Sequence, residues 1–116
     1  MKFRIHRTTQ YLPVFLLLLI GTTPRTYAET ASDLFLRGWS AYENKDFSTA
    51  LKHWSPLAEN GNQDAQYLLG ILFTNGLGVS VDFKEANKWF RKSAEQGDVG
   101  AQYYLGIFME AGKGHP

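Results

Sequence analysis

Few residues of this 116-residue chain have the types and spacing that catalysis requires. The chain has no cysteine, which excludes a thiol nucleophile, a disulfide bond and a cysteine-ligated zinc site. Beyond residue 28 the histidines are His53 and His115, and neither has the partner groups of a catalytic triad or a metal site near it in the sequence. We interpret His53 as a half-buried packing residue rather than a base or a ligand. The sequence therefore predicts no enzyme activity, no metal and no cofactor.

Two Gly-x-Gly pairs, at 76–78 and 112–114, are the nearest approach to a phosphate-binding motif. Neither pair has the third glycine, the preceding strand or the lysine that phosphate-binding loops use. Turns between paired helices explain both pairs better. We interpret the carboxylates of Glu85 and Glu95 as solvated charges on helix faces, which is the usual place of such residues.

The charge distribution argues against nucleic acid as a partner. Four of the 12 basic residues and none of the 11 acidic residues lie in residues 1–28, so the rest of the chain carries a net charge of −3, against +1 for the whole. A negative domain repels the phosphate backbone that dominates nucleic-acid affinity. The basic helix face that the sequence does contain is short and flanked by acidic residues; it comprises Lys84, Lys88, Arg91 and Lys92.

Residues 1–28 have the order of a secretory signal peptide. A basic segment at 1–10 precedes a leucine-rich run at 11–20, and small residues stand at Thr26 and Ala28. The run is shorter than the roughly 20 residues that a membrane-spanning helix needs. We expect cleavage after Ala28, a periplasmic or secreted mature protein, and no stable insertion in the membrane; an uncleaved membrane anchor or a buried N-terminal helix is the alternative.

The elements that would position any site come from an internal repeat. When residues 47–79 are aligned with residues 83–115, a shift of 36, 14 of the 33 positions are identical. The densest match joins residues 65–71 with 101–107, where small and apolar residues recur at helical spacing. The sequence predicts five helices, at about 32–44, 47–60, 63–75, 83–96 and 99–111.

Residues 65–79, followed by Ala86 and Phe90, resemble a Sel1-like repeat, the 36-residue branch of the tetratricopeptide superfamily. The resemblance extends over about residues 34–114. It implies an all-α fold, a right-handed superhelical array of antiparallel helix hairpins with about two and a half repeats, in one domain at 29–116. It also implies work as a scaffold or adaptor, often in envelope or secretion complexes.

Gly38, Gly70 and Gly106 are equivalent packing points in the first helix of each pair. In such arrays the first helices form a concave face. Counting three residues back and four forward from each glycine selects six side chains on that face: Phe35, Tyr42, Tyr67, Thr74, Tyr103 and Glu110. Aromatic rings with polar tips are favoured in recognition, so we predict a non-enzymatic module that binds a protein or peptide there. Packing within the repeat stack is the alternative role for Tyr67 and Tyr103.

Three further hypotheses stay open at the level of sequence. A cell-wall-fragment binder or an envelope hydrolase is the alternative function, although no constellation of Ser, Lys, Glu and His supports a hydrolase. The pattern stops after the first helix of the third unit, which would also fit a truncated member of a longer array. The apolar face of the last helix predicts self-association or pairing with a partner through that edge; it includes Tyr104, Ile107, Phe108 and Met109.

Overall fold

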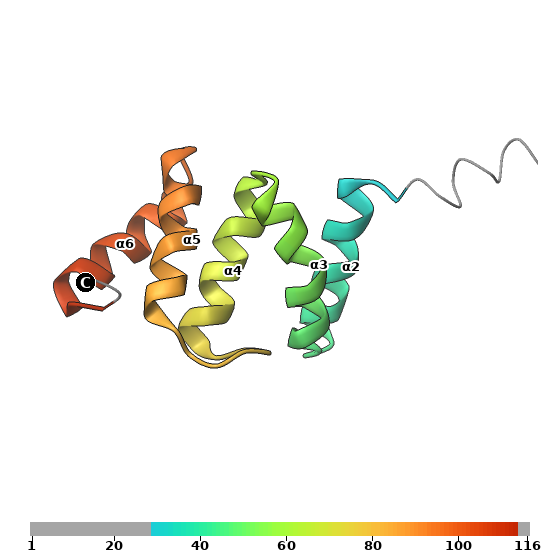
Figure 1. The fold of residues 1–116 in the computed structure, drawn as a ribbon, viewed down its shortest axis with the longest axis horizontal. Helices are drawn as coiled ribbons and strands as arrows, with labels where there is room; N and C mark the ends of the chain where they lie inside the picture. The colour runs from blue at the N-terminus through green and yellow to red at the C-terminus, as the bar shows by residue number, and fades with distance from the viewer. Residues whose placement is uncertain (1–28, 114–116) are drawn as a thin grey trace, which may run out of the picture. The chain divides into compact units, whose positions relative to one another are not determined.

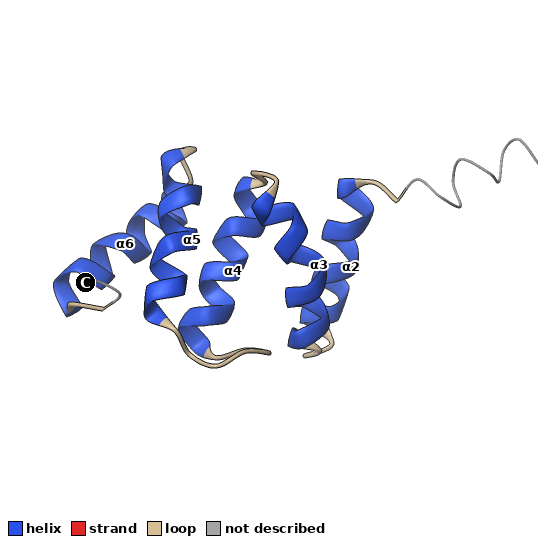
Figure 2. Cartoon of the chain, in the orientation of Figure 1, coloured by secondary structure: helices blue, strands red, loops and turns tan. Residues whose placement is uncertain are grey.

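The structure, a computed structural model, describes residues 29–113, which form five α-helices and no strand (Figure 1, Figure 2). The helices are α2 (Ala31–Glu43), α3 (Phe47–Glu59), α4 (Gln63–Asn75), α5 (Phe83–Glu95) and α6 (Val99–Ala111). The predicted all-α fold is confirmed, and every helix begins and ends within one residue of its expected bounds.

The helices belong to one compact unit that begins at Ala31. The predicted signal peptide at 1–28 lies outside the described residues, as does the segment 114–116. Between residues 29 and 113, every helix is too short or too polar to cross a membrane.

Capping residues set where four of the helices begin. Asp46, Asn62, Asp82 and Asp98 precede α3, α4, α5 and α6 in that order. Each side chain accepts a hydrogen bond from the backbone N–H three residues later, at 2.7–3.3 Å. Such caps satisfy amide donors that have no partner within the helix and contribute about 0.5–2 kcal/mol each. The sequence therefore determines these helix starts locally.

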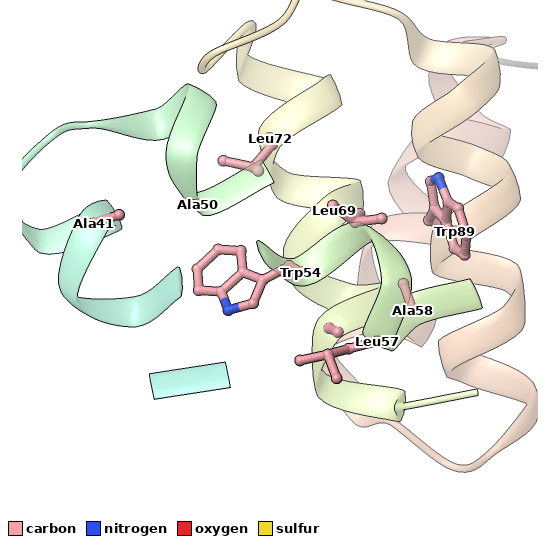
Figure 3. Close-up of a cluster of buried hydrophobic side chains, with 9 residues drawn as sticks. Ala41, Ala50, Trp54, Leu57, Ala58, Leu69, Leu72 and Trp89 are labelled. Carbon is pink, nitrogen blue, oxygen red and sulfur yellow. The ribbon is translucent and has the colours of Figure 1, made fainter. Parts of the chain in front are cut away.

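Helices that follow one another in the chain pack together, so α2 with α3 and α4 with α5 form two hairpins (Figure 1). α6 packs on α5 and, less extensively, on α4. Figure 3 shows the Trp54 ring directed from α3 toward α2. The first core cluster comprises Ala41, Ala50, Trp54, Leu57, Ala58, Ala65, Leu69, Leu72 and Trp89. The second core cluster comprises Ala86, Phe90, Ala101 and Phe108.

The loop between α4 and α5 touches the first hairpin. Gly76 and Gly78 adopt left-handed φ angles of 67° and 70°, a conformation that glycine reaches without steric cost. Gly78 lies so close to α3 that an added Cβ would stand 2.5 Å from the carbonyl carbon of Phe47. The neighbouring Leu77 and Val79 pack against the first core cluster. The Gly-x-Gly pair at 76–78 is thus a helix-to-helix turn, as expected.

Candidate functional site

Phe35 and Tyr42, the predicted binding residues of α2, pack inside the first hairpin. Both rings lie beside Trp54 of α3, at centroid distances of 6.0 Å and 5.8 Å. Tyr42 also meets Phe47 edge-on at 5.3 Å. The Trp54 Nε1–H donates a hydrogen bond to the Phe35 carbonyl oxygen at 3.1 Å. Because aromatic pairs at these distances are stabilising, these two residues support the hairpin, and their part in binding stays a prediction.

Tyr67 and Thr74 of α4 are half-buried. The Tyr67 ring lies against Phe90 of α5 and Tyr104 of α6, at centroid distances of 5.8 Å and 6.2 Å. Burial, followed by the nearby Tyr104, raises the pKa of Tyr67 above its ordinary value of 10.0, because desolvation disfavours the phenolate. The Thr74 hydroxyl donates to the Gly70 carbonyl oxygen at 2.7 Å. The packing role considered for Tyr67 is therefore present, and binding by either residue stays a prediction.

Tyr103 and Glu110 of α6 are the two predicted residues that share an open depression. Both are exposed, Tyr103 to 66%. With Gln102, Gly106 and Ile107 they line a surface depression of about 400 Å³. A carboxylate beside a phenol and an amide can hold a side chain of a partner, but it lacks the paired nucleophile and base of a catalytic site. Of the six predicted binding residues, Tyr103 and Glu110 are therefore the two whose exposure best suits binding.

The three glycines that set the register have different surroundings. An added Cβ on Gly38 would overlap the indole of Trp54, and one on Gly70 would overlap the ring of Phe90. Both aromatic side chains are fully buried. On Gly106 an added Cβ would meet no atom of the described residues within 4 Å. We call the space over Gly106, which lines the depression on α6, the open slot.

A second depression, of about 460 Å³, opens between α3 and α5 and is absent from the sequence predictions. It is lined by Ser55, Glu59, Leu69, Phe73, Glu85, Lys88, Trp89 and Lys92. The Trp89 Nε1–H donates to the Glu85 carboxylate at 3.1 Å, and Lys88 pairs with the same oxygen at 2.6 Å. The Lys88 and Lys92 ammonium groups stand 4.8 Å and 5.7 Å from the Trp89 ring centroid. Glu85 is thus a paired side chain, which corrects its interpretation as a solvated charge.

The sequence did contain a signal for this second depression. Glu85, Lys88, Trp89 and Lys92 follow the spacing i, i+3, i+4 and i+7, which places them on one face of α5. The spacing does not reveal which helix stands opposite, and α3 supplies the other wall. Charges of both signs over an apolar floor suit the binding of a polar segment.

A family model for the Sel1 repeat matches residues 27–62, 63–98 and 99–116. The chain belongs to the Sel1 repeat family. The first two Sel1 matches each contain a complete hairpin, and the third contains α6. The predicted family and the helical repeat fold are confirmed. Sel1 repeats are generally protein–protein interaction modules, and proteins built from them are typically non-catalytic.

The crystal structure of a Sel1 repeat protein from Oxalobacter formigenes is similar to this chain, with a TM-score of 0.64 and 39% sequence identity. The match covers 71% of this chain and 33% of that protein, so this chain spans about a third of its length. No curated protein matches. The solved relative shares the Sel1 repeat architecture.

Two observations bear on chemistry in these Sel1 repeats. In residues 29–113 no three His, Asp or Glu side chains are grouped so that they could hold a metal ion. His53 is half-buried on α3, which fits its interpretation as a packing residue.

Proposed function

We propose that this chain is a non-enzymatic protein-interaction or scaffold module of the cell envelope, and that it binds a protein or peptide along the first helices of its repeats. The observation that carries the proposal is where exposed apolar side chains lie. In residues 29–113, six of the seven exposed large hydrophobic side chains are on α2 and α6, both first helices. They are Leu36, Trp39, Val99, Tyr103, Ile107 and Met109; the seventh, Val81, is in a loop.

This distribution favours recognition because exposed apolar groups that gather on a surface mark interaction sites. Trp and Tyr are the residues most enriched at binding hot spots. Trp39 is stacked on Tyr42 at a centroid distance of 5.8 Å and an interplanar angle of 20°, so its exposed ring is held in place before any partner arrives. Because such a ring is already held in place, covering it with a partner costs little side-chain entropy.

The envelope location in this proposal rests on the amino-acid pattern of residues 1–28. N-terminal sequencing of the chain recovered from an envelope fraction tests it, and we expect the mature protein to begin at Glu29. A protein that begins at Met1 would contradict export with cleavage and would leave the binding proposal standing.

Binding along the first helices is tested by affinity capture with two double variants of the chain. The double variant Leu36→Ala with Tyr103→Ala removes a largely exposed leucine side chain from α2 and a largely exposed tyrosine ring from α6. Lys84→Ala with Arg91→Ala, both exposed on α5, is the matched control. We expect the first variant to recover at least tenfold less of each partner than the control. Equal recovery by both would exclude the first helices as the binding surface.

The variants avoid Phe35 and Tyr42 for a structural reason. Both rings pack on Trp54, so truncating them would weaken the first hairpin and would confuse lost folding with lost binding.

A further inference from the structure

The two complete hairpins show how the first helix of a repeat receives its second helix. In each, the second helix inserts one aromatic ring against the glycine of the first: Trp54 against Gly38, and Phe90 against Gly70. Only a residue without a Cβ lets a ring approach the helix backbone so closely. Four residues before each ring stands an alanine, Ala50 in α3 and Ala86 in α5, and both are fully buried.

Polar contacts fix the register of the second hairpin around this ring. Three residues after Phe90, the Ser93 hydroxyl donates to the Gln63 carbonyl oxygen at 3.0 Å. Six residues after Phe90, the Gln96 Nε2–H donates to the side-chain oxygen of Gln66 at 2.8 Å. The second helix is therefore recognised by a ring, a hydroxyl and a carboxamide at fixed spacing.

α6 carries the same glycine and glutamine as α4, but no helix of the described residues covers them (Figure 1). Gly106 corresponds to Gly70, and the depression around it is wide enough, at about 400 Å³, to accept a ring. The Gln102 Nε2–H donates to the Ala94 carbonyl oxygen at 3.4 Å, as the Gln66 Nε2–H does to the Ala58 carbonyl oxygen at 3.0 Å. The Gln102 side chain is thus oriented like that of its counterpart, with its oxygen available as an acceptor.

We propose that the open slot on α6 docks an amphipathic helix of a partner protein, which inserts a Phe or Trp ring against Gly106. The partner helix carries alanine four residues before the ring, serine three residues after it and a carboxamide six residues after it. This is the pattern of α5, the second helix of the second hairpin, offered by another protein. The proposal rests on the proposed function, since it names the kind of partner that α6 binds.

Charge supports this occupant. By analogy with the α4–α5 hairpin, a helix docked antiparallel to α6 places its N-terminal half near Glu110, which lies on the rim of the depression. A basic residue there would complement the carboxylate, and α5 itself carries Lys84 and Lys88 in the corresponding half. Complementary charges at a rim set orientation and association rate more than affinity.

The test uses the full chain and a synthetic, fluorescently labelled peptide with the sequence of residues 82–98, which contains the complete pattern. Fluorescence anisotropy measures the binding. We expect saturable binding to the wild-type chain, and an affinity at least tenfold weaker for the peptide with Phe90→Ala. We also expect at least a tenfold loss for the chain with Gly106→Leu, whose side chain would fill the open slot.

An added Cβ at Gly106 meets no described atom within 4 Å, so the backbone there tolerates a side chain and we expect the Gly106→Leu variant to keep the fold. Its circular dichroism spectrum and thermal midpoint verify this. Absence of saturable binding, or equal binding by wild type and Gly106→Leu, would overturn the proposal. A wild-type dimer in sedimentation that Gly106→Leu abolishes would overturn it too, because a second copy would then be the occupant.

These results are separable from those of the proposed function. Failure of the peptide to bind leaves capture through Leu36 and Tyr103 untouched. Equal capture by both double variants, with peptide binding that still depends on Gly106, would exclude Leu36 and Tyr103 as the residues that capture the partner and would retain the docking slot on α6.

Discussion

Residues 65–71 and 101–107 differ at one position of seven, yet the structure places them in different surroundings. In α4 the segment is covered by α5, so Gly70 is buried under Phe90 and Tyr67 is half-buried. In α6 the equivalent Gly106 and Tyr103 face outward. The comparison shows that the repeat motif specifies a surface that receives a helix, and that the burial of this surface depends on a second element. The same residues of such a motif therefore pack against a helix in one repeat and are available to bind a partner in another.

The largest expected effect comes from removing the ring that fills a slot. Phe90→Ala should lower the free energy of unfolding by about 3–5 kcal/mol, because it leaves a cavity in the second core cluster. Tyr103→Ala, at an exposed ring, should change it by less than about 0.5 kcal/mol. Urea denaturation of both variants measures the difference. Similar values for the two would mean that α6 is covered as fully as α4.

Alanine at the two matched glycines should act in opposite directions. Gly70→Ala should destabilise the chain by about 1–3 kcal/mol, because its Cβ overlaps the Phe90 ring. Gly106→Ala should stabilise it by up to about 1 kcal/mol, because alanine favours the helix and meets no described atom. The thermal midpoints of the two variants, compared with that of the wild type, measure these changes in stability. A loss of stability in both variants would contradict an open slot.

The capping residues offer a smaller contrast between the two ends of the array. The Asp98 carboxylate accepts from the Ala101 N–H at 2.7 Å in a partly buried site, whereas that of Asp46 accepts from the Thr49 N–H at 3.3 Å in an exposed one. Asp98→Ala should therefore cost about 1–2 kcal/mol of the free energy of unfolding, and Asp46→Ala should cost less. Chemical denaturation checks the order, which a larger loss for Asp46→Ala would reverse.

The smallest effect concerns the pH dependence at Tyr67. Its pKa in the folded chain is raised above 10.0, mainly by burial. A raised pKa means that the neutral phenol stabilises the fold at pH values below 10, and that this contribution is lost as pH rises through the folded-state pKa. Tyr67→Phe should therefore unfold less readily than the wild type above pH 10. Identical alkaline unfolding curves for the wild type and Tyr67→Phe would show that the ionisation of Tyr67 does not destabilise the fold above pH 10.

Local features of the fold could be predicted from the sequence because single residues determine them. Asn62 and Asp98 cap helices through their own side chains, and Gly76 ends a helix through its left-handed backbone. The shift of 36 residues then carries the bounds of α3 onto those of α5 and the bounds of α4 onto those of α6. Family and repeat fold followed from the same residues.

The candidate site could be predicted only in part, because it depends on which element lies opposite. Counting from the glycines selected Tyr67 and Tyr103 alike, and sequence spacing could not tell the covered ring from the exposed one. Phe35 was selected as a binding residue, but the ring of Trp54, which is 19 residues away, packs beside it and donates to its carbonyl oxygen. The depression beside Trp89 was missed because its walls belong to two different repeats.

The contact of Gly78 with the start of α3 has a consequence for how the array responds to load. Leu77 and Val79 pack against the first core cluster, and Gly78 between them lies against Phe47 of the first repeat, so pulling the hairpins apart must first extract this loop. Repeat proteins unfold one unit at a time when the coupling between neighbours is weak, and as a whole when it is strong. The two hairpins should therefore rupture as a single mechanical event, with α6 as the segment that peels away first.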